Sequence, residues 1–160
     1  MPLIAPRSIG TLRPGQSLQQ VAATCPRSLA LWDWGDEGIP APMLVVGLGG
    51  AIVELIFEDT LASSRVVSLR ITHPRARTAE GVGPGSTLGD LVRTYGPARF
   101  EEAECVLYAS FARAEGLSFR LRLPKPFDCI DVTRLGESQR GVPAEARVHA
   151  VVVYGRDRPT

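Results

Sequence analysis

The sequence predicts an α+β fold in which short helices lie on one face of an antiparallel sheet. A chain of 160 residues, of which 44% are hydrophobic, suits one domain with a substantial core. A helix-opening motif occurs twice, and most of the remaining chain consists of short alternating runs that are typical of hairpin-linked strands. We therefore expect residues 1–160 to form a single domain of two related helix-plus-strands units, at approximately 9–78 and 79–154.

The duplicated motif reads Pro-Gly-x-Ser/Thr-Leu-x-x-Leu/Val and begins at Pro14 and again at Pro84, 70 residues later. A Pro-Gly pair favours a turn. After the turn, Ser17 in the first copy, and Ser86 or Thr87 in the second, offers a hydroxyl oxygen to the free backbone amides of a new helix. Each copy of the motif therefore predicts the start of a helix.

The same segments carry signals for the course and the end of each helix. Gln20 and Asp90 stand at the position where a side chain completes a capping box. Pro26 and Pro97 follow about two turns later, and proline ends a helix. The predicted helices run at about 17–25 and 87–95.

Alternation of apolar and polar residues predicts strands in the rest of the chain. Within residues 117–123, leucine and phenylalanine occupy the odd positions, and serine and arginine occupy the even positions up to 122. This pattern is typical of an antiparallel strand with one exposed face. The predicted strands lie at 29–34, 43–46, 52–57, 67–72, 106–111, 117–123 and 147–154. Residues 124–145 are predicted to form a long irregular return.

Charge and hydropathy bear on partners and compartment. The formal net charge is +1, which argues against non-specific binding to nucleic acid or to anionic membranes. No apolar run reaches the roughly 20 residues that span a bilayer. Residues 1–10 lack the features of a signal peptide, so a cytoplasmic protein and a protein whose signal has been removed both remain open.

The duplicated motif resembles the repeat of small bacterial envelope proteins, among them the BamE/SmpA outer-membrane assembly lipoproteins and the β-lactamase inhibitory proteins, which have two such units in tandem. The matching residues are Gly15, Ser17, Gln20 and Val21 in the first copy and Gly81, Gly85, Thr87, Asp90, Leu91, Gly96 and Pro97 in the second. The resemblance implies a place outside the bacterial cytoplasm, periplasmic or secreted. It implies no functional residues, because the matching positions are structural, and no lipid anchor, because the start of the chain has no lipobox cysteine.

Three cysteines, Cys25, Cys105 and Cys129, cannot all pair within one chain. Cys105 and Cys129 flank a predicted strand and the proline-rich return, so a disulfide between them is sterically feasible. The alternative is that all three are buried apolar thiols, which is common for free cysteine.

Two sets of residues are candidates for binding. The first is a loop that concentrates both tryptophans and three acids: Trp32, Asp33, Trp34, Asp36 and Glu37. Such a loop suits the docking of a partner or ligand, whereas the alternatives are tryptophans that fill the core and acids that bind a metal or act in catalysis. The second set is four arginines predicted on the exposed sheet face: Arg70, Arg120, Arg122 and Arg147. This face suits an acidic partner, or is an ordinary exposed face paired with the glutamates at 101–104.

Known catalytic and cofactor motifs are incomplete. The glycines at 47–50 lack the third small residue of a dinucleotide loop, and the segment 81–86 lacks the P-loop lysine. His73 and His149 stand in no recognised Cys–His or zinc spacing. We therefore expect no cofactor and no metal.

These observations favour a non-enzymatic protein that binds another protein through the exposed sheet face or the loop of residues 32–40. One rival hypothesis is a small-molecule binder or weak hydrolase whose pocket brings together Asp33, Asp36 or Glu37 with shifted pKa values. A second is a structural module of a larger assembly, which would expose an apolar patch.

Overall fold

The computed structural model describes residues 1–25, 28–34, 40–59, 63–125 and 127–155, without the side chains of residues 28–34 and 40–41. Its helices are α1 (Leu18–Thr24), α2 (Leu88–Tyr95) and α3 (Cys129–Ser138), with a short 3-10 helix η2 (Ala112–Ala114). Its strands are β1 (Leu3–Ala5), β2 (Ser8–Ile9), β3 (Ser28–Trp34), β4 (Pro40–Leu48), β5 (Ala51–Phe57), β6 (Val66–Ile71), β7 (Arg77–Thr78), β8 (Ala98–Ala103), β9 (Val106–Phe111), β10 (Leu117–Arg122) and β11 (Arg147–Tyr154).

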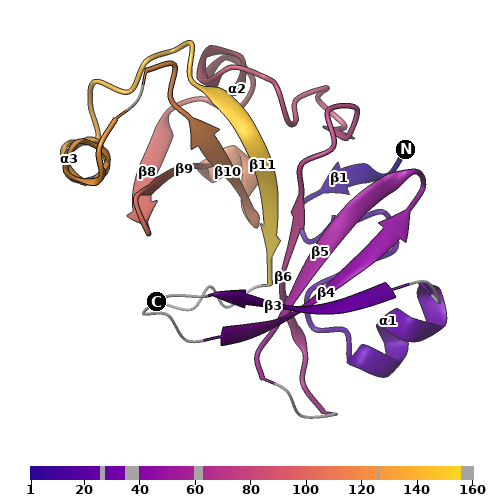
Figure 1. Ribbon diagram of the computed structural model, residues 1–160. Helices are drawn as coiled ribbons and strands as arrows, with labels where there is room; N and C mark the ends of the chain where they lie inside the picture. The colour runs from indigo at the N-terminus through magenta and orange to yellow at the C-terminus, as the bar shows by residue number, and fades with distance from the viewer. Residues whose placement is uncertain (26–27, 35–39, 60–62, 126, 156–160) are drawn as a thin grey trace.

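The main sheet has eight strands in the order β3-β4-β5-β6-β11-β10-β9-β8, and every neighbouring pair is antiparallel. Each half of the sheet is a four-stranded meander that follows a helix, α1 before β3 and α2 before β8. The halves meet where β6 pairs with β11, and they splay apart on either side of this seam (Figure 1). The predicted α+β class with an antiparallel sheet is confirmed.

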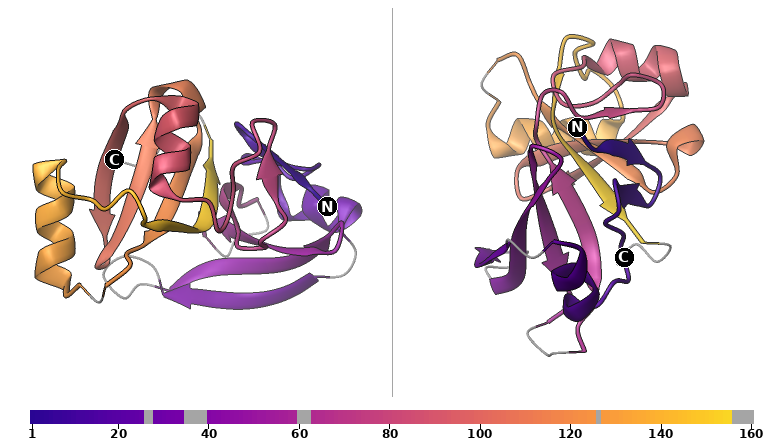
Figure 2. Two further views of the ribbon diagram at one scale, coloured as in Figure 1. Left: turned by 90° about the horizontal axis from the view of Figure 1, so that it is seen from above. Right: turned by 90° about the vertical axis from the view of Figure 1, so that its right-hand side faces the viewer.

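A small three-stranded sheet, β2-β1-β7, packs beside the half that contains β5 and β6. Its strand β1 pairs parallel with β7, which joins the start of the chain to the segment just before the second motif. The views in Figure 2 place this small sheet and α1 at one end of the molecule and α3 at the other.

One continuous core occupies the helix side of the sheet. Val21 of α1 and Leu91 of α2 are both fully buried in it. A row of cross-strand neighbours, all at most 1% exposed, crosses the sheet on this face: Val46, Val53, Ile71, Val151, Phe119 and Ala109. Burial of each large side chain contributes roughly 1.5–3 kcal/mol, so this row is a main source of stability.

Tyr95 at the end of α2 packs the helix against this core. Its ring lies 5.7 Å from that of Phe111 and 6.0 Å from that of Phe119, measured between centroids. Its hydroxyl lies 2.9 Å from Oε2 of Glu80 and 3.0 Å from Oγ1 of Thr78. Burial, with the Glu80 carboxylate as a further cause, raises the pKa of Tyr95 to about 12.

Both helices begin with the capping box that the motif predicts. The hydroxyl oxygen of Ser17 accepts a hydrogen bond from the Gln20 amide, and that of Thr87 accepts one from the Asp90 amide. The N3 side chains return the bond to the backbone amides of the cap residues. Between the two alternatives for the second cap, the structure selects Thr87.

Each Pro-Gly segment is also bonded to the first residues of the last strand in its half. The Gly15 amide donates to the Val66 carbonyl at 2.7 Å, and the Gly85 amide donates to the Val148 carbonyl at 2.8 Å. The segment thereby extends the ladder of β6 or β11, and it fixes where the following helix leaves the sheet.

Two segments differ from the prediction. Residues 124–145 contain α3, which Asp128 caps by accepting a hydrogen bond from the Asp131 amide. Residues 98–103, which lie outside the predicted strands, form β8 at the edge of the sheet. Among the described residues, no helix has the length and apolar character required to cross a bilayer.

Candidate functional site

The face of the sheet opposite the core carries the polar residues. One row of cross-strand neighbours on this face runs from Glu54 through Arg70, Val152 and Ser118 to Ser110. In the adjacent row on this face, two residues further along β10, Arg120 lies between Ala150 and Tyr108. The alternation of β10 therefore places its arginines on this face, as the sequence predicts.

A basic cluster forms on this face around His149. Nη2 of Arg122 lies 3.3 Å from Nδ1 of His149. Burial lowers the pKa of His149, and the charges of Arg120, Arg122 and Arg70 lower it further, while Glu54 acts in the opposite direction. Three arginines therefore act on one imidazole, and they outnumber the one described carboxylate, Glu54, that acts on it.

Within the described part of the chain, Arg70 is the member of the cluster that has a carboxylate partner. Its Nε forms an ion pair with Oε2 of Glu54, its directly opposed neighbour on β5. Its Nη2 also lies 4.0 Å from Sδ of Met43 on β4. Glu54 thus partly neutralises the end of the cluster that faces the first half of the sheet.

A register shift explains why His149 joins the cluster. Arg120 pairs with Ala150 and Leu121 pairs with Val148, so His149 is the extra residue of a β-bulge. Such a bulge re-aims side chains relative to strict alternation. The sequence contains no clear sign of the bulge. The predicted binding set omits His149, although it lies two residues after Arg147 in the predicted strand and alternation alone would place it on the same face as that arginine.

A hollow of about 250 Å³ opens beside the cluster. Its lining includes Arg120, Arg122, Lys125 and His149, with Phe127 on one side. No aspartate or glutamate is among the described residues that line it. The hollow therefore combines cationic donors with an apolar wall, and its own lining supplies no compensating negative charge.

Cys105 also lines this hollow and forms a disulfide with Cys129, with 4.7 Å between the two Cα atoms. The bond ties the turn after β8 to the first residue of α3, 24 positions later. The third cysteine, Cys25, is free and buried, and burial raises the pKa of its thiol. Glu102 lies near both disulfide sulfurs, but sulfurs joined to each other are not thiolate ligands for a metal.

Helix α3 covers the outer edge of β8. Gly136 packs against Glu102, where an added Cβ would lie 3.1 Å from that of Glu102. The Gln139 side chain accepts a hydrogen bond from the Phe100 amide at 2.8 Å and donates one to the Phe100 carbonyl at 2.6 Å. These bonds satisfy backbone groups that an uncovered edge strand would offer to another chain.

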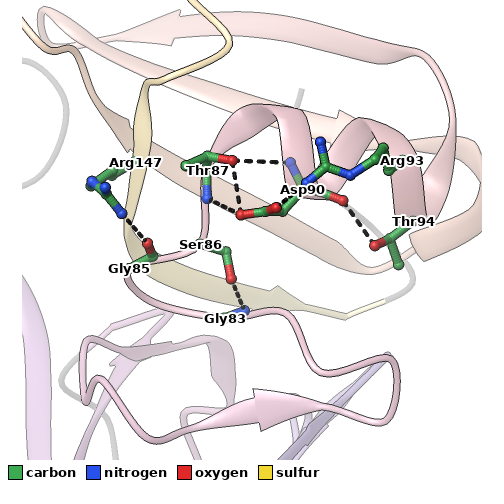
Figure 3. A network of polar contacts seen from close by, with 8 residues as sticks. All are labelled: Gly83, Gly85, Ser86, Thr87, Asp90, Arg93, Thr94 and Arg147. Atoms are coloured by element: carbon green, nitrogen blue, oxygen red, sulfur yellow. Dashed lines mark hydrogen bonds and ion pairs between the residues drawn. The ribbon is translucent and has the colours of Figure 1, made fainter.

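Arg147, the fourth arginine of the predicted set, is held elsewhere. Its Nη1 donates to the Gly85 carbonyl at 3.0 Å, next to the second Pro-Gly turn (Figure 3). Arg147 is not among the residues that line the hollow, and its charge is not among those that shift the pKa of His149. The structure thus gathers Arg70, Arg120 and Arg122 around His149, whereas Arg147, the cross-strand neighbour of Arg122, directs its guanidinium to the Gly85 carbonyl.

The loop before α2 uses its amides internally. Gly83 donates to Oγ of Ser86, Thr87 donates to Asp90, and Leu88 donates to the Ala146 carbonyl (Figure 3). Since these donors already have partners, the turn and the helix cap account for the loop. The sequence-based interpretation of residues 81–86 as a turn rather than a phosphate site agrees with this geometry.

The tryptophan loop lies largely outside the described residues. Asp36 and Glu37 belong to the part of the chain that is not described, and Trp32, Asp33 and Trp34 are described only as backbone in β3, which pairs with β4. A second hollow, of about 560 Å³, is lined by Arg7, Arg99, Tyr154 and other described residues.

Comparisons with known proteins give a likeness of fold. No protein-family model matches the chain, and no curated protein matches it. The chain resembles the crystal structure of the uncharacterised protein yfeY from Escherichia coli with a TM-score of 0.64. The match covers 95% of this chain and 99% of that one at 12% sequence identity, which supports a shared fold.

Proposed function

We propose that this protein is a non-enzymatic binding protein that docks an acidic protein through the polar sheet face around His149, where Arg122 is exposed and Arg120 and His149 are half-buried. The observation that carries the proposal is the part of the basic cluster formed by Arg120, Arg122 and His149, beside a hollow whose described lining residues include no acid. The whole chain has a formal net charge of only +1, so this concentration of positive charge is local. A local patch attracts a complementary surface and sets the orientation of the complex.

The proposed location is outside the bacterial cytoplasm. The Cys105–Cys129 disulfide supports it, because disulfides persist in oxidising compartments and are rare in the reducing cytosol. The likeness of the two Pro-Gly segments to envelope-protein repeats supports the same location.

The proposal is tested with fluorescein-labelled poly-L-glutamate as the acidic probe and poly-L-lysine as its opposite. Fluorescence anisotropy should show saturable binding of poly-L-glutamate and no binding of poly-L-lysine. The binding should weaken as salt shortens the Debye length, which is about 10 Å at 0.1 M.

The double variant Arg120→Gln/Arg122→Gln removes charge from the cluster, and Arg134→Gln/Arg140→Gln removes the same charge from exposed positions in and just after α3. The first variant should weaken binding about tenfold or more, since two charge-assisted contacts are lost, whereas the second should bind nearly as the wild type does. Equal weakening in both variants would contradict the proposal.

A further inference from the structure

We propose that the hollow beside the Cys105–Cys129 disulfide binds a single oxyanion group, a carboxylate or a phosphate, held by Arg120, Arg122 and Lys125 with His149 in its wall. This inference deepens the proposed function and rests on it in one respect, because it names the chemical group through which an acidic partner would be held. The same chemistry serves a free oxyanion, and the experiment below separates the two sources.

Charge is the first argument. Arg120, Arg122 and Lys125 line a hollow of about 250 Å³, and none of the described residues in its lining carries a carboxylate. Glu54, the acid that acts on His149, is paired with Arg70 on the neighbouring strands. Three like charges that share a hollow repel one another, and an oxyanion between them replaces this repulsion with attraction.

Size is the second argument. Pockets that enclose whole drug-sized ligands measure roughly 300–1,000 Å³. The hollow, at about 250 Å³, is smaller than that range, so it suits one charged group rather than a nucleotide or a sugar. The apolar ring of Phe127 offers a surface for the carbon atoms that carry the group.

The hydrogen-bond donors are the third argument. An arginine has no acceptor, so the Arg122 Nη2 must donate to Nδ1 of His149, and the neutral ring then carries its proton on Nε2. A guanidinium has five N–H donors in a planar fork, and a single bond to His149 leaves most of them for an oxyanion. The imidazole and the guanidinium are thus arranged as donors before any ligand arrives.

Binding of the anion should be linked to a proton on His149. The charged groups that act on this imidazole are Arg120 and Arg122 from β10, Arg70 from β6 and Glu54 from β5, and Lys125 lines the same hollow. An oxyanion opposes the effect of the arginines, so it should raise the pKa of His149 toward its ordinary value. By linkage, the affinity should increase as the pH falls through the range in which His149 titrates.

The test uses the full ¹⁵N-labelled chain, titrated with inorganic phosphate at constant ionic strength, while the imidazole nitrogens of His149 and His73 are followed by NMR. Phosphate should shift the His149 signals in a saturable way and raise its titration midpoint, and the His73 signals serve as an internal reference. Arg122→Gln and Lys125→Gln, both at exposed positions, should each weaken the binding about tenfold, whereas Arg134→Gln should leave it unchanged.

A competition arm adds labelled poly-L-glutamate, with and without phosphate. Displacement of the peptide by phosphate would support a shared oxyanion site that serves the partner. Phosphate binding without peptide binding would support the hollow as a site for a free oxyanion and would overturn the proposed docking of a protein. If the peptide binds but neither the peptide nor phosphate shifts the His149 signals, the oxyanion site is overturned. The docking proposal then stands.

Discussion

Arg65 and Arg147 make the same contact in the two halves of the molecule. Nη1 of Arg65 donates to the Gly15 carbonyl at 3.2 Å, and Nη1 of Arg147 donates to the Gly85 carbonyl at 3.0 Å. Each arginine precedes the valine that is bonded to the same Pro-Gly segment. The likeness of the two segments therefore includes an Arg-Val pair at the start of the last strand in each half.

The two helix caps should contribute similar amounts to stability. Ser17→Ala and Thr87→Ala should each lower the free energy of unfolding by about 1 kcal/mol, because each leaves an N3 amide without its acceptor. Thr87→Ala should cost more, since the Thr87 hydroxyl also donates to Oδ2 of Asp90. Urea denaturation measures both, with Thr11→Ala, an exposed turn residue, as the control.

Asp90 provides an independent readout of the second cap. The Thr87 amide, and then its hydroxyl, hold the pKa of Asp90 below its ordinary value. In Thr87→Ala the pKa of Asp90 should rise, while Ser17→Ala should leave it unchanged. A carboxylate titration that is the same in both variants would show that the cap is not formed in solution.

The caps were predictable from sequence because their chemistry is local. Pro-Gly followed by Ser17 or Thr87 and a matching N3 side chain specifies the start of a helix within seven residues. Helix α3 gives a weaker signal, because its buried residues are only Val132 and Gly136, while Ile130 is 62% exposed. Its position depends on packing against β8 and on a disulfide, and both of these connect distant parts of the chain.

The binding site was predictable only in part for the same reason. Strict alternation is enough to place Arg120 and Arg122 on the exposed face of β10. His149 joins them through a β-bulge, and Lys125 and Phe127 join them through the course of the chain after β10. These relationships depend on register and on tertiary contacts, which no local pattern in the sequence records.

The Cys105–Cys129 disulfide should stabilise the fold by restricting the unfolded chain. A bond that closes a loop of 24 residues contributes about 3 kcal/mol in the chain-entropy treatment. The double variant Cys105→Ser/Cys129→Ser should lose about this much stability, and hydrogen exchange should accelerate first in α3. Cys25→Ala tests whether the loss is specific to the bonded pair.

Alkylation followed by intact-mass measurement checks the bond itself. Denatured protein without reductant should accept one alkyl group, on Cys25, and denatured, reduced protein should accept three. Peptide mapping should join Cys105 to Cys129. If denatured protein accepts three alkyl groups without reductant, the disulfide is absent. The main support for an oxidising compartment is then lost.

Gln139 should protect the edge of the sheet. Its side chain bonds both the amide and the carbonyl of Phe100, so Gln139→Ala should lower the free energy of unfolding by about 1–2 kcal/mol. The exposed edge of β8 should also promote self-association, which sedimentation velocity detects.

Gln139→Glu keeps the acceptor and loses the donor, so it should have an intermediate effect, and Gln19→Ala on α1 is the control. A monomer of unchanged stability in Gln139→Ala would show that α3 protects this edge without the glutamine.

Stability should depend on pH through His149. Its pKa is lowered in the folded protein, so the unfolded state binds more protons in the range just below the ordinary histidine value of 6.5. The free energy of unfolding should therefore fall as the pH decreases from 7.5 to 5.5, and His149→Gln should lose this part of the dependence. The lowered pKa values of Glu80 and Asp90 affect stability at lower pH, below the ordinary glutamate and aspartate values of 4.5 and 3.8. Urea denaturation at pH 7.5, 6.5 and 5.5 gives the comparison, with His73→Gln as the matched control. If the difference between wild type and His149→Gln stays constant across this range, the arginines do not act on His149 as the structure indicates.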